Sequence, residues 1–334
     1  MLAAGLGERL RPLTNFLPKP LLPIAGRPVC GHTLRALRAA GCEEAALNLH
    51  HLGGAIRSAL GADYEGLPLT YSEEPVLLGT LGPLHALRSF LGAADQVLLV
   101  NGDSLCRWPF ARMLAVHRRS GAAATLLLAK RASPAEYGGG VAVDRDGRVV
   151  SLRGSEPRGE VAARYVFAGA HVLRADLVAA VPAGPGDIMS GLYAPLLAGG
   201  ARLQTVVSGR RWHDLGTPRR YLDAALDWER MWWRGSRHEP GSAIEEGSRL
   251  RRSVVSNGAR VSEGALVESS VLLAGAQVTA GCVVSGCVLG PGVRLPSGAR
   301  IDSRLVTTAR PGELPRAQDS MVGGLVYSPL EPRP

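Results

Sequence analysis

The sequence predicts two kinds of fold in one chain of 334 residues: a Rossmann-like, doubly wound α/β domain and then a parallel β-helix. Short apolar runs alternate with helical stretches over the first two thirds of the chain, which predicts a mostly parallel sheet. Further on, apolar residues and glycines recur with a fixed period, which predicts stacked coils. We place the α/β domain at 1–234, a linker at 235–243, the β-helix at 244–310 and a cap or tail at 311–334.

The α/β region takes its expected elements from local signals in the chain. Pro28 stands at the start of the first helical stretch and Gly41 directly after it, as is typical of helix ends. An Arg-Asp-Gly turn between the apolar runs 141–144 and 148–152 predicts a β-hairpin. The expected helices span 28–40, 54–60, 80–91, 109–119, 187–197 and 218–233, and the expected strands span 45–49, 69–72, 96–100, 122–130, 164–173 and 202–207.

The C-terminal region repeats every 17 residues. From Ile244 onward apolar residues follow one another at steps of 6, 5 and 6 residues, and glycines such as Gly247 and Gly264 keep the same period. Three short apolar positions in each repeat predict three faces per coil, and therefore a triangular prism. Because such prisms stack and mediate assembly, we expect the chain to form a homo-oligomer through this region.

Composition excludes several classes of protein. The net charge is +9, and 36 of the 38 basic residues are arginine, the two lysines being Lys19 and Lys130. We expect no nucleic-acid partner, because no recognition motif or aromatic stacking surface accompanies this charge. The five cysteines form no CxxC pair, and no signal peptide or apolar run long enough for a membrane span occurs. These features predict a cytoplasmic protein that keeps its thiols reduced.

The stretch GLGERLRPLTNFLPKP, close to the N-terminus, is the main candidate for a binding site. Gly5 and Gly7 allow a sharp turn that exposes backbone amides to an anion. Arg9 and Lys19 add a guanidinium and an ammonium group, and the prolines on both sides of Lys19 favour an extended backbone. Amides and cations in one short stretch suit a triphosphate.

Two familiar glycine motifs are absent: the P-loop lysine is missing, and a leucine stands where the dinucleotide fingerprint needs its third glycine. The pattern LAAGxGxRxxPLT followed by PKP instead resembles the sugar-1-phosphate nucleotidylyltransferase family. This resemblance implies an enzyme that joins a sugar 1-phosphate to a nucleoside triphosphate and releases pyrophosphate. It implies nucleotide contacts from Ala4, Gly5 and Gly7, and catalytic roles for Arg9 on the pyrophosphate and Lys19 on the sugar phosphate.

Two aspartates are candidate metal ligands. Asp103 follows the apolar strand 96–100, where ligands bind in open α/β sheets. An Asx-turn or a cap for the following helix is the structural alternative for this residue. Asp214 lies in the segment WHDLGTP, before a helix that starts at Pro218. The resemblance implies that both carboxylates hold Mg²⁺, a hard cation that bridges phosphates.

The acidic pair Glu73 and Glu74, followed by Gly79 and Thr80, resembles the base-reading segment of the family. A carboxylate accepts both adjacent donors of the guanine edge, so Glu74 favours GTP; a thymine or uracil edge suits an amide better. The choice between the two acids stays open, as does a solvated acidic turn. GTP with mannose 1-phosphate is the first expectation, with UTP or dTTP and a glucose, heptose or N-acetylmuramate 1-phosphate as alternatives.

The expected sugar site departs from the family pattern at one position. Gly138 and Gly169 match glycines that let the backbone approach the sugar. Glu156 precedes a proline directly, so the lysine of the family's Glu-Lys-Pro is missing. Arg153 and Arg158 are the residues that could supply the second phosphate contact in its place.

Two other functions stay open at this point. A non-catalytic regulatory subunit, which binds a sugar nucleotide and partners an enzyme through the prism, is favoured by the missing lysine. It is also favoured by the short strand before the glycine loop, which leads us to expect a natural start upstream of Met1. The presence of Lys19, Asp103 and Asp214 argues against it. An acyltransferase would need a histidine base in the repeat, but the last histidine is His238, before the repeat.

Overall fold

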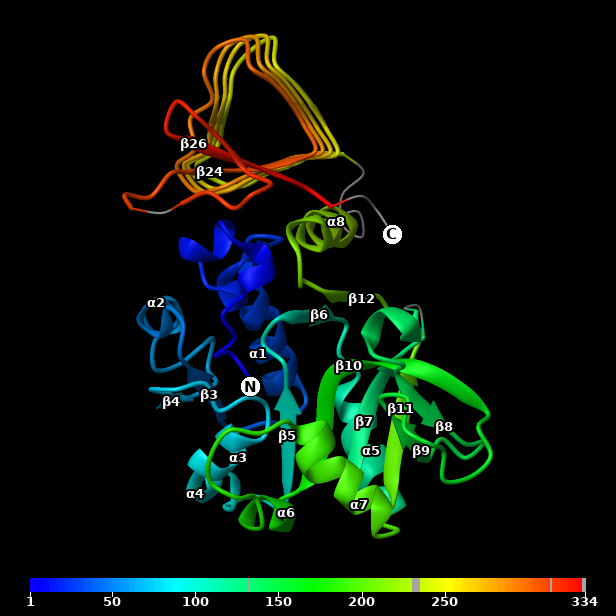
Figure 1. Cartoon of the computed structure of the whole chain (residues 1–334). Coiled ribbons are helices and arrows are strands. Elements are labelled where there is room, and N and C mark those ends of the chain that lie inside the picture. Colours follow the sequence, from blue (N-terminus) through cyan, green and yellow to red (C-terminus); the bar gives the residue numbers. More distant parts are fainter. Residues whose placement is uncertain (131–132, 230–234, 313, 332–334) are drawn as a thin grey trace. The chain divides into compact units, whose positions relative to one another are not determined.

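The computed structural model describes residues 1–130, 133–229, 235–312 and 314–331 (Figure 1). These residues form two compact units, which do not follow a single cut in the sequence. Unit 1 contains Met1–Gly5 and Cys30–His213. Unit 2 contains Leu6–Val29 and everything from Asp214 onward. The glycine- and arginine-rich stretch is thus divided after Gly5, and most of it belongs to the same unit as the C-terminal prism.

The main sheet of unit 1 has the strand order β11-β7-β10-β8-β9, with β5 paired to β10. β11 runs parallel to β7, whereas β10 runs antiparallel to β5, β7 and β8. β8 and β9 form the predicted hairpin, with Val141 opposite Leu152. The strands are β5 (Gln96–Val100), β7 (Ala124–Ala129), β8 (Val141–Val143), β9 (Val149–Leu152), β10 (Ala163–Arg174) and β11 (Leu203–Ser208).

A second, parallel pair lies beside this sheet: β3 (Ala45–Leu49) and β4 (Leu69–Glu73). The sequence predicts the end of a strand just before the glycine loop. In the structure Leu2 forms only isolated parallel β-bridges there, one to Asn48 and one to Asn101. Two short strands follow the main ones, β6 (Ser104–Cys106) and β12 (Trp212–Asp214). The α/β fold class predicted from the alternation of strands and helices is confirmed, although β10 runs antiparallel to its neighbours and β8 and β9 form an antiparallel hairpin.

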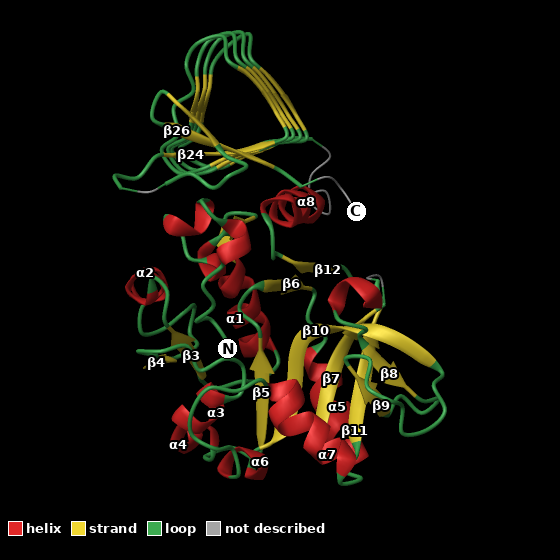
Figure 2. Ribbon diagram, viewed as in Figure 1, coloured by secondary structure: helices red, strands yellow, loops and turns green. Residues whose placement is uncertain are grey.

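Helices pack around the strands of unit 1 (Figure 2). Most of them begin and end within a few residues of the predicted positions. The predicted helix 80–91 is broken at Leu87, whose backbone leaves the helical region (φ −99°, ψ 13°). The predicted helix 187–197 opens as a π turn, η5 (Met189–Tyr193), and continues as α7 (Ala194–Ala198). The other helices are α1 (Val29–Ala39), α2 (Gly53–Leu60), α3 (Gly82–Ala86), α4 (Arg88–Leu91), α5 (Phe110–Ser120) and α6 (Asp176–Ala179), with the 3₁₀ turn η4 (Pro134–Tyr137).

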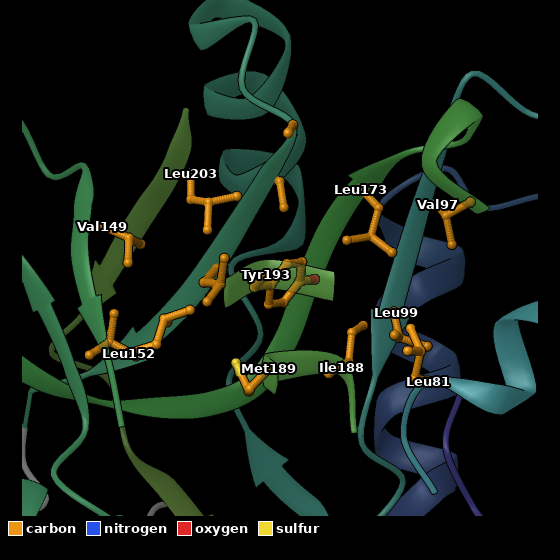
Figure 3. Close-up of a cluster of buried hydrophobic side chains, with 14 of the residues drawn as sticks. Leu81, Val97, Leu99, Val149, Leu152, Leu173, Ile188, Met189, Tyr193 and Leu203 are labelled. Atoms are coloured by element: carbon orange, nitrogen blue, oxygen red, sulfur yellow. The ribbon is translucent and has the colours of Figure 1, made fainter. Parts of the chain in front are cut away.

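One cluster of buried hydrophobic side chains in unit 1 joins the main sheet to the segment 188–193 (Figure 3). Leu99 and Leu173 come from β5 and β10, and Ile188 and Tyr193 pack against them from η5 and the residue before it. The Tyr193 hydroxyl contacts Nδ1 of the buried His171 at 2.7 Å. Burial lowers the pKa of His171 to about 3, so this histidine is neutral at physiological pH. This packed core holds β5, the strand that precedes the candidate metal ligand Asp103.

Unit 2 begins with the arginine-rich part of the stretch, folded into three 3₁₀ turns. Leu10, Leu13 and Leu22 are fully buried beneath these turns. The Tyr221 hydroxyl of α8 donates to the Pro23 carbonyl oxygen at 2.8 Å, which holds the end of the stretch against the helix. The elements are η1 (Glu8–Leu10), η2 (Leu13–Asn15), η3 (Lys19–Leu21), β1 (Pro23–Ile24), β2 (Arg27–Pro28) and α8 (Pro218–Glu229). The last residues of the predicted helix 218–233 lie outside the described residues.

The rest of unit 2 is a left-handed β-helix with the predicted 17-residue coils. Parallel pairs join Val254 to Val271 and Val271 to Val288, which repeats the sequence period on one face. Figure 2 shows the strands of successive coils aligned on the three faces of a triangle. The faces are β13 (Arg237–His238), β16 (Val254–Val255), β19 (Val271–Leu272), β22 (Val288–Leu289) and β24 (Arg304–Thr308); β14 (Ala243–Ile244), β17 (Arg260–Val261) and β20 (Gln277–Val278); and β15 (Arg249–Arg251), β18 (Leu266–Glu268), β21 (Val283–Ser285) and β23 (Arg300–Asp302).

Both ends of the prism differ from a simple repeat. β13 pairs with β16, so the parallel ladder of the prism begins inside the stretch that we expected to be a linker. The apolar pattern did not predict this strand, because backbone hydrogen bonds between strands need no apolar side chains. At the other end β26 (Leu325–Pro329) runs antiparallel to β24 and β25 (Ser320–Val322). The segment expected as a cap or tail thus covers the last strand of one face. Within the described ranges, no helix has both the length and the apolar character that a membrane crossing needs.

Candidate active site

The glycine loop places its two glycines in different environments. Gly7 has a φ of +63° and precedes η1, and a Cβ on it would lie 2.8 Å from Thr14 Cγ2. The Thr14 hydroxyl also donates to the Gly7 carbonyl oxygen at 2.9 Å. The fold therefore requires glycine at position 7. Among the described atoms, a Cβ on Gly5 would meet nothing within 4 Å, so the backbone there faces open space that a ligand could fill.

Three cations surround Asp214 in unit 2. Arg220 Nη1 lies 2.6 Å from Asp214 Oδ2, and Lys19 Nζ lies 3.8 Å from Oδ1. A Cβ on Gly216 would lie 2.9 Å from Arg9 Nη2 and 3.0 Å from Asp214 Oδ2, so Arg9 reaches the same place. The structure thus brings together the predicted Arg9, Lys19 and Asp214, and it adds Arg220, which we did not predict. Three positive charges around one carboxylate leave a net positive site suited to phosphates.

Lys19 and Asp214 are well shielded from solvent, with side chains 10% and 17% exposed. Charges in such a place interact more strongly than at the surface. Arg220 could have been found from the sequence, because it follows the predicted helix start at Pro218 by two residues. A side chain in the first turn of a helix points back toward the residues that precede the helix.

Asp103 lies in unit 1, in a turn between β5 and β6 that two close backbone contacts define. The Gly102 amide donates to the Leu2 carbonyl oxygen at 2.8 Å, and the Asn101 amide donates to that of Gly169 at 2.7 Å. Gly169 has a φ of +81°, and a Cβ on it would lie 3.0 Å from Ser104 Oγ. The predicted sugar-binding glycine is therefore packed against the predicted metal-binding turn. The N-cap of α5 is Pro109, so Asp103 does not cap that helix.

The two aspartates belong to different units, Asp103 to unit 1 and Asp214 to unit 2. Across the described residues, no group of three or more His, Cys, Asp or Glu side chains gathers in a way that could hold a metal. A Mg²⁺ ion needs no such group when phosphates and water supply most of its ligands. Each aspartate offers carboxylate oxygens, the ligand type that Mg²⁺ prefers.

Glu73 and Glu74 have opposite environments. Glu73 Oε1 pairs with Arg57 Nη2 at 2.6 Å on the surface. Glu74 is only 4% exposed; its Oε1 accepts from Asn48 Nδ2 at 2.7 Å and its Oε2 from the Leu78 amide at 3.0 Å. Asn48 Oδ1 in turn accepts from the Ala3 amide at 2.8 Å. Glu74 therefore holds the loop that follows it and joins this loop to the residues just before the glycine loop.

Asn48 is a second residue that the sequence analysis missed. The signal for it was present, because Asn48 is a polar residue inside the otherwise apolar strand Ala45–Leu49. A polar side chain buried in such a strand needs hydrogen-bond partners. Asn48 finds them in Ala3 and Glu74.

Gly79 and Thr80 are held against the segment 184–188. Gly79 has a φ of +71°, and a Cβ on it would lie 2.3 Å from the Gly186 carbonyl oxygen. The Thr80 amide donates to that same oxygen at 2.9 Å, and Thr80 Oγ1 accepts from the Ile188 amide at 2.8 Å. The Thr80 side chain therefore stabilises the fold. A ligand could approach the backbone of Gly79 and Thr80 instead.

The expected sugar site lies around the hairpin β8–β9. Gly138 follows η4 with a φ of +66°, and a Cβ on it would find no described atom within 4 Å. Glu156 is exposed in the turn after β9. Arg153 binds Asp187 with two hydrogen bonds of 3.0 Å, and Arg158 donates to the Ala198 carbonyl oxygen at 3.1 Å. Both candidates for the missing lysine therefore have partners within the protein.

Asp187 connects the two loops of unit 1 that carry the expected base and sugar contacts. Its Oδ2 accepts from Arg153 and lies 3.4 Å from the Thr80 hydroxyl. Burial raises the pKa of Asp187, but hydrogen bonds from Ser190 and the positive charge of Arg153 outweigh it, and the pKa lies below its usual value. The carboxylate is therefore ionised at neutral pH and keeps the two loops together.

Comparison with known proteins matches two consecutive regions of the chain to two family models. The family model described as "Nucleotidyl transferase" matches residues 1–230, and one described as "GlmU-like, C-terminal hexapeptide" matches residues 238–310. The catalytic subunit beta of mannose-1-phosphate guanylyltransferase from Drosophila pseudoobscura pseudoobscura is 32% identical over 225 residues, which is 66% of this chain and 60% of that protein. The mannose-1-phosphate guanyltransferase of Debaryomyces hansenii is 31% identical over 230 residues, 68% of this chain and 63% of that one. The chain therefore spans less than two thirds of these relatives.

Solved structures share the fold at lower sequence identity. A Bacillus anthracis protein, titled as a glucose-1-phosphate thymidylyltransferase, superposes with a TM-score of 0.59 and 22% identity, covering 68% of this chain and 93% of its own. The Yersinia pseudotuberculosis protein HddC superposes with a TM-score of 0.56 and 20% identity, covering 68% of this chain and 97% of its own. At these identities the likeness is one of fold.

Proposed function

Because the chain belongs to the nucleotidyl transferase family, we propose that it joins a sugar 1-phosphate to a nucleoside triphosphate and releases pyrophosphate. The observation that carries the proposal is the group of three cations, Arg9, Lys19 and Arg220, around Asp214. Three cations around one carboxylate leave a net positive charge, which suits a phosphate. GTP and mannose 1-phosphate are the substrates we propose first, since the curated relatives named above are mannose-1-phosphate guanylyltransferases.

In this reaction the protein positions the two substrates and need not transfer a proton. A phosphate oxygen of the sugar 1-phosphate forms a bond to the α-phosphorus, and the bond from that phosphorus to the bridging oxygen of the β-phosphate breaks. The attacking group is already an anion, so no base is required. Lys19 holds the sugar phosphate beside the α-phosphate, while Arg9 and the amides of Gly5 and Gly7 hold the pyrophosphate that leaves. These fixed positive groups stabilise charge as it moves onto the leaving oxygens.

We assign Asp103 and Asp214 as the residues that hold Mg²⁺. When bound, this ion neutralises phosphate charge and helps the leaving group depart. Arg220 fixes Oδ2 of Asp214, so Oδ1, which faces Lys19 at 3.8 Å, is the oxygen held less tightly. The role of Arg220 in this scheme is to orient the Asp214 carboxylate.

The loop from Glu74 to Thr80 is the proposed base site. Each oxygen of the Glu74 carboxylate accepts one hydrogen bond from the protein and keeps lone pairs that could accept from a base. Its bonds from Asn48 and Leu78 also hold the loop in place. The Gly79 backbone is the proposed approach to the base, and Gly138, Glu156 and Gly169 are the proposed sugar contacts. The stacked coils of the prism are the proposed contact between copies of the chain. Light scattering of the purified protein tests for an oligomer, which would have a mass above the 35.1 kDa of a single chain.

Pyrophosphate release tests the proposal directly. Each of GTP, UTP, dTTP, ATP and CTP is offered with Mg²⁺ against mannose, glucose, heptose and N-acetylmuramate 1-phosphates. We expect release with one pair, most readily GTP with mannose 1-phosphate, and loss of it in Asp103→Ala and on addition of EDTA. Nucleotide-sugar binding without release from any pair would contradict the enzyme and support the regulatory subunit instead.

A further inference from the structure

We propose that Arg153 binds the phosphate of the sugar 1-phosphate, and that Asp187 competes with this phosphate for the guanidinium group of Arg153. In the chain without substrate, Asp187 holds the arginine; when the sugar 1-phosphate binds, the arginine exchanges one anion for the other. This role of Arg153 rests on the proposed function and deepens it, because it adds a substrate contact and a group of the protein that competes with the substrate. Both residues belong to unit 1.

The backbone of Arg153 is bound to the glycine turn 138–140, which carries one of the proposed sugar contacts. The Arg153 amide donates to the Gly140 carbonyl oxygen at 2.8 Å, and its φ of +45° lies in the left-handed region that such residues rarely adopt. A Cβ on Gly139 would lie 3.1 Å from the Gly154 nitrogen, so the two turns pack directly against each other. Among the described atoms, a Cβ on Gly138 would meet nothing within 4 Å. The turn that holds Arg153 therefore also borders open space.

The ion pair between Arg153 and Asp187 has good geometry but is open to solvent. Nη1 and Nη2 of the arginine donate to the two carboxylate oxygens at 3.0 Å each. The two side chains are 58% and 35% exposed, and ion pairs as exposed as this contribute little to stability. A sugar phosphate offers the same guanidinium fork up to two negative charges instead of one. It therefore attracts Arg153 more strongly than the carboxylate does.

Asp187 keeps hydrogen bonds of its own when Arg153 leaves it. Its Oδ1 accepts from the Ser190 amide at 3.0 Å and from the Ser190 hydroxyl at 3.1 Å, and its Oδ2 lies 3.4 Å from the Thr80 hydroxyl. The segment that carries Asp187 is also held by its backbone, because the Gly186 carbonyl oxygen accepts from the Thr80 amide at 2.9 Å. The exchange therefore leaves no buried carboxylate without a partner and breaks no backbone hydrogen bond.

Arg158, the other arginine that follows β9, makes its contacts elsewhere in unit 1. Its amide donates to the Val150 carbonyl oxygen at 2.8 Å, and its Nη1 donates to the Ala198 carbonyl oxygen at 3.1 Å. These partners lie in β9 and at the end of α7, whereas the backbone partner of Arg153 lies in the glycine turn. The contacts therefore favour Arg153 over Arg158 as the residue that binds the sugar phosphate.

Calorimetry on the full chain tests the exchange, with mannose 1-phosphate and glucose 1-phosphate as probes in the presence of Mg²⁺. We expect Arg153→Gln to bind the preferred probe at least about tenfold more weakly than the unchanged chain, the usual loss for a charge-assisted hydrogen bond. Asp187→Asn should bind it about two- to fivefold more tightly, because the competing ion pair is gone and the arginine is free in every molecule. The double variant should bind as Arg153→Gln does, since without the arginine there is nothing to compete for.

A second ion pair on the same hairpin supplies matched controls. Arg145 Nη2 lies 3.0 Å from Glu160 Oε1, and the two side chains are 82% and 72% exposed. Arg145→Gln and Glu160→Gln remove the same kinds of charge as the two test substitutions, and both should bind the probes as the unchanged chain does. Thermal melts of all the variants show whether the fold is retained.

The opposite signs of the two effects separate the exchange from a purely structural role. If the ion pair only held the hairpin to the segment 184–188, Asp187→Asn would weaken binding just as Arg153→Gln does, and that result would overturn the proposal. Unchanged binding in Arg153→Gln would also overturn it, as would a loss of binding in Arg158→Gln alone. The same holds if neither probe shows saturable binding to the unchanged chain.

Steady-state pyrophosphate release then assigns the effect to one substrate. We expect the KM for the sugar 1-phosphate to rise at least about tenfold in Arg153→Gln and to fall about two- to fivefold in Asp187→Asn. The KM for the nucleotide should stay within about twofold in both, because neither substitution removes the Thr80 backbone contacts. An equal change in both KM values would contradict the assignment to the sugar phosphate. If no substrate pair gives release, the proposed function fails, and the calorimetry still decides whether Asp187 competes for Arg153.

Discussion

Arg220 Nη1 lies 2.6 Å from Asp214 Oδ2, and this ion pair joins the first turn of α8 to the strand that precedes it. Asp214 is thereby held in place before any substrate arrives, with Lys19 on its other oxygen at 3.8 Å. The pair is largely shielded from solvent, since the two side chains are 29% and 17% exposed. It therefore differs from the exposed ion pairs of the surface, whose contributions are small.

We expect Arg220→Ala to lower kcat/KM about 10- to 100-fold, the usual effect of losing a charge-assisted hydrogen bond of about 1.5–3 kcal/mol. The Mg²⁺ concentration for half-maximal rate should rise as well, because Asp214 loses the group that orients it. Arg220→Lys keeps the charge but loses the fork, and should recover only part of the rate. Steady-state kinetics with Mg²⁺ titrations measures both effects; an unchanged rate in Arg220→Ala would contradict the role.

We expect Lys19→Arg to be nearly as inactive as Lys19→Ala, with kcat lowered at least about 100-fold in both. The Lys19 side chain is only 10% exposed, and a planar guanidinium cannot take the place of a compact ammonium there. Pyrophosphate release at saturating substrate measures kcat. Recovery of the rate in Lys19→Arg would mean that charge alone matters at this position.

We expect Asn48→Ala to lower the free energy of unfolding by about 1–3 kcal/mol, because it leaves the buried Glu74 carboxylate without one donor. The KM for the nucleotide should rise too, since the loop from Glu74 to Leu78 and the Ala3 amide lose their common partner. Urea unfolding and steady-state kinetics measure the two effects.

Glu73→Ala is the control for Asn48→Ala, since it removes a neighbouring ion pair whose side chains are 52% and 56% exposed. An exposed pair of this kind contributes about 0–1 kcal/mol, so this variant should be close to the unchanged chain. Equal destabilisation by both substitutions would contradict the assigned role of Asn48.

We expect stability to fall with pH through His171. Its pKa is about 3 in the folded chain and about 6.5 when unfolded, so between these values the unfolded state binds more protons. The free energy of unfolding therefore decreases as pH falls below about 6.5, by at most about 1.4 kcal/mol for each pH unit. Urea unfolding at pH 7 and pH 5 should show a drop that is about 2 kcal/mol smaller in His171→Gln. An equal drop in both proteins would contradict this assignment.

The sequence predicted those parts of the molecule that depend on local pattern. The 17-residue period determines the prism, because each buried position, such as Val267 or Val284, repeats one coil later. The helix Val29–Ala39 and the hairpin β8–β9 follow from turn and cap signals that lie next to them in the chain.

The parts that sequence reasoning missed depend on contacts between distant residues. The Asn48 bond to Glu74 spans 26 positions, and no local pattern points from one to the other. The break of the helix 80–91 at Leu87 and the antiparallel direction of β10 were missed for the same reason. The motif pattern predicted Arg9, Lys19 and Asp214, and the fold added the cation next to them.

The number of coils in the prism determines where Arg310 lies relative to the N-terminal turns. Arg310 follows the last coil, yet it donates to the Asn15 carbonyl oxygen near the other end of the sequence. Adding or deleting one whole coil of 17 residues would preserve the ladder but move this arginine by one strand spacing, about 4.8 Å. A hydrogen bond of 2.8 Å cannot survive such a step. The coil number is therefore matched to the N-terminal turn, and insertions or deletions in the repeat should be tolerated only where the tail changes with them.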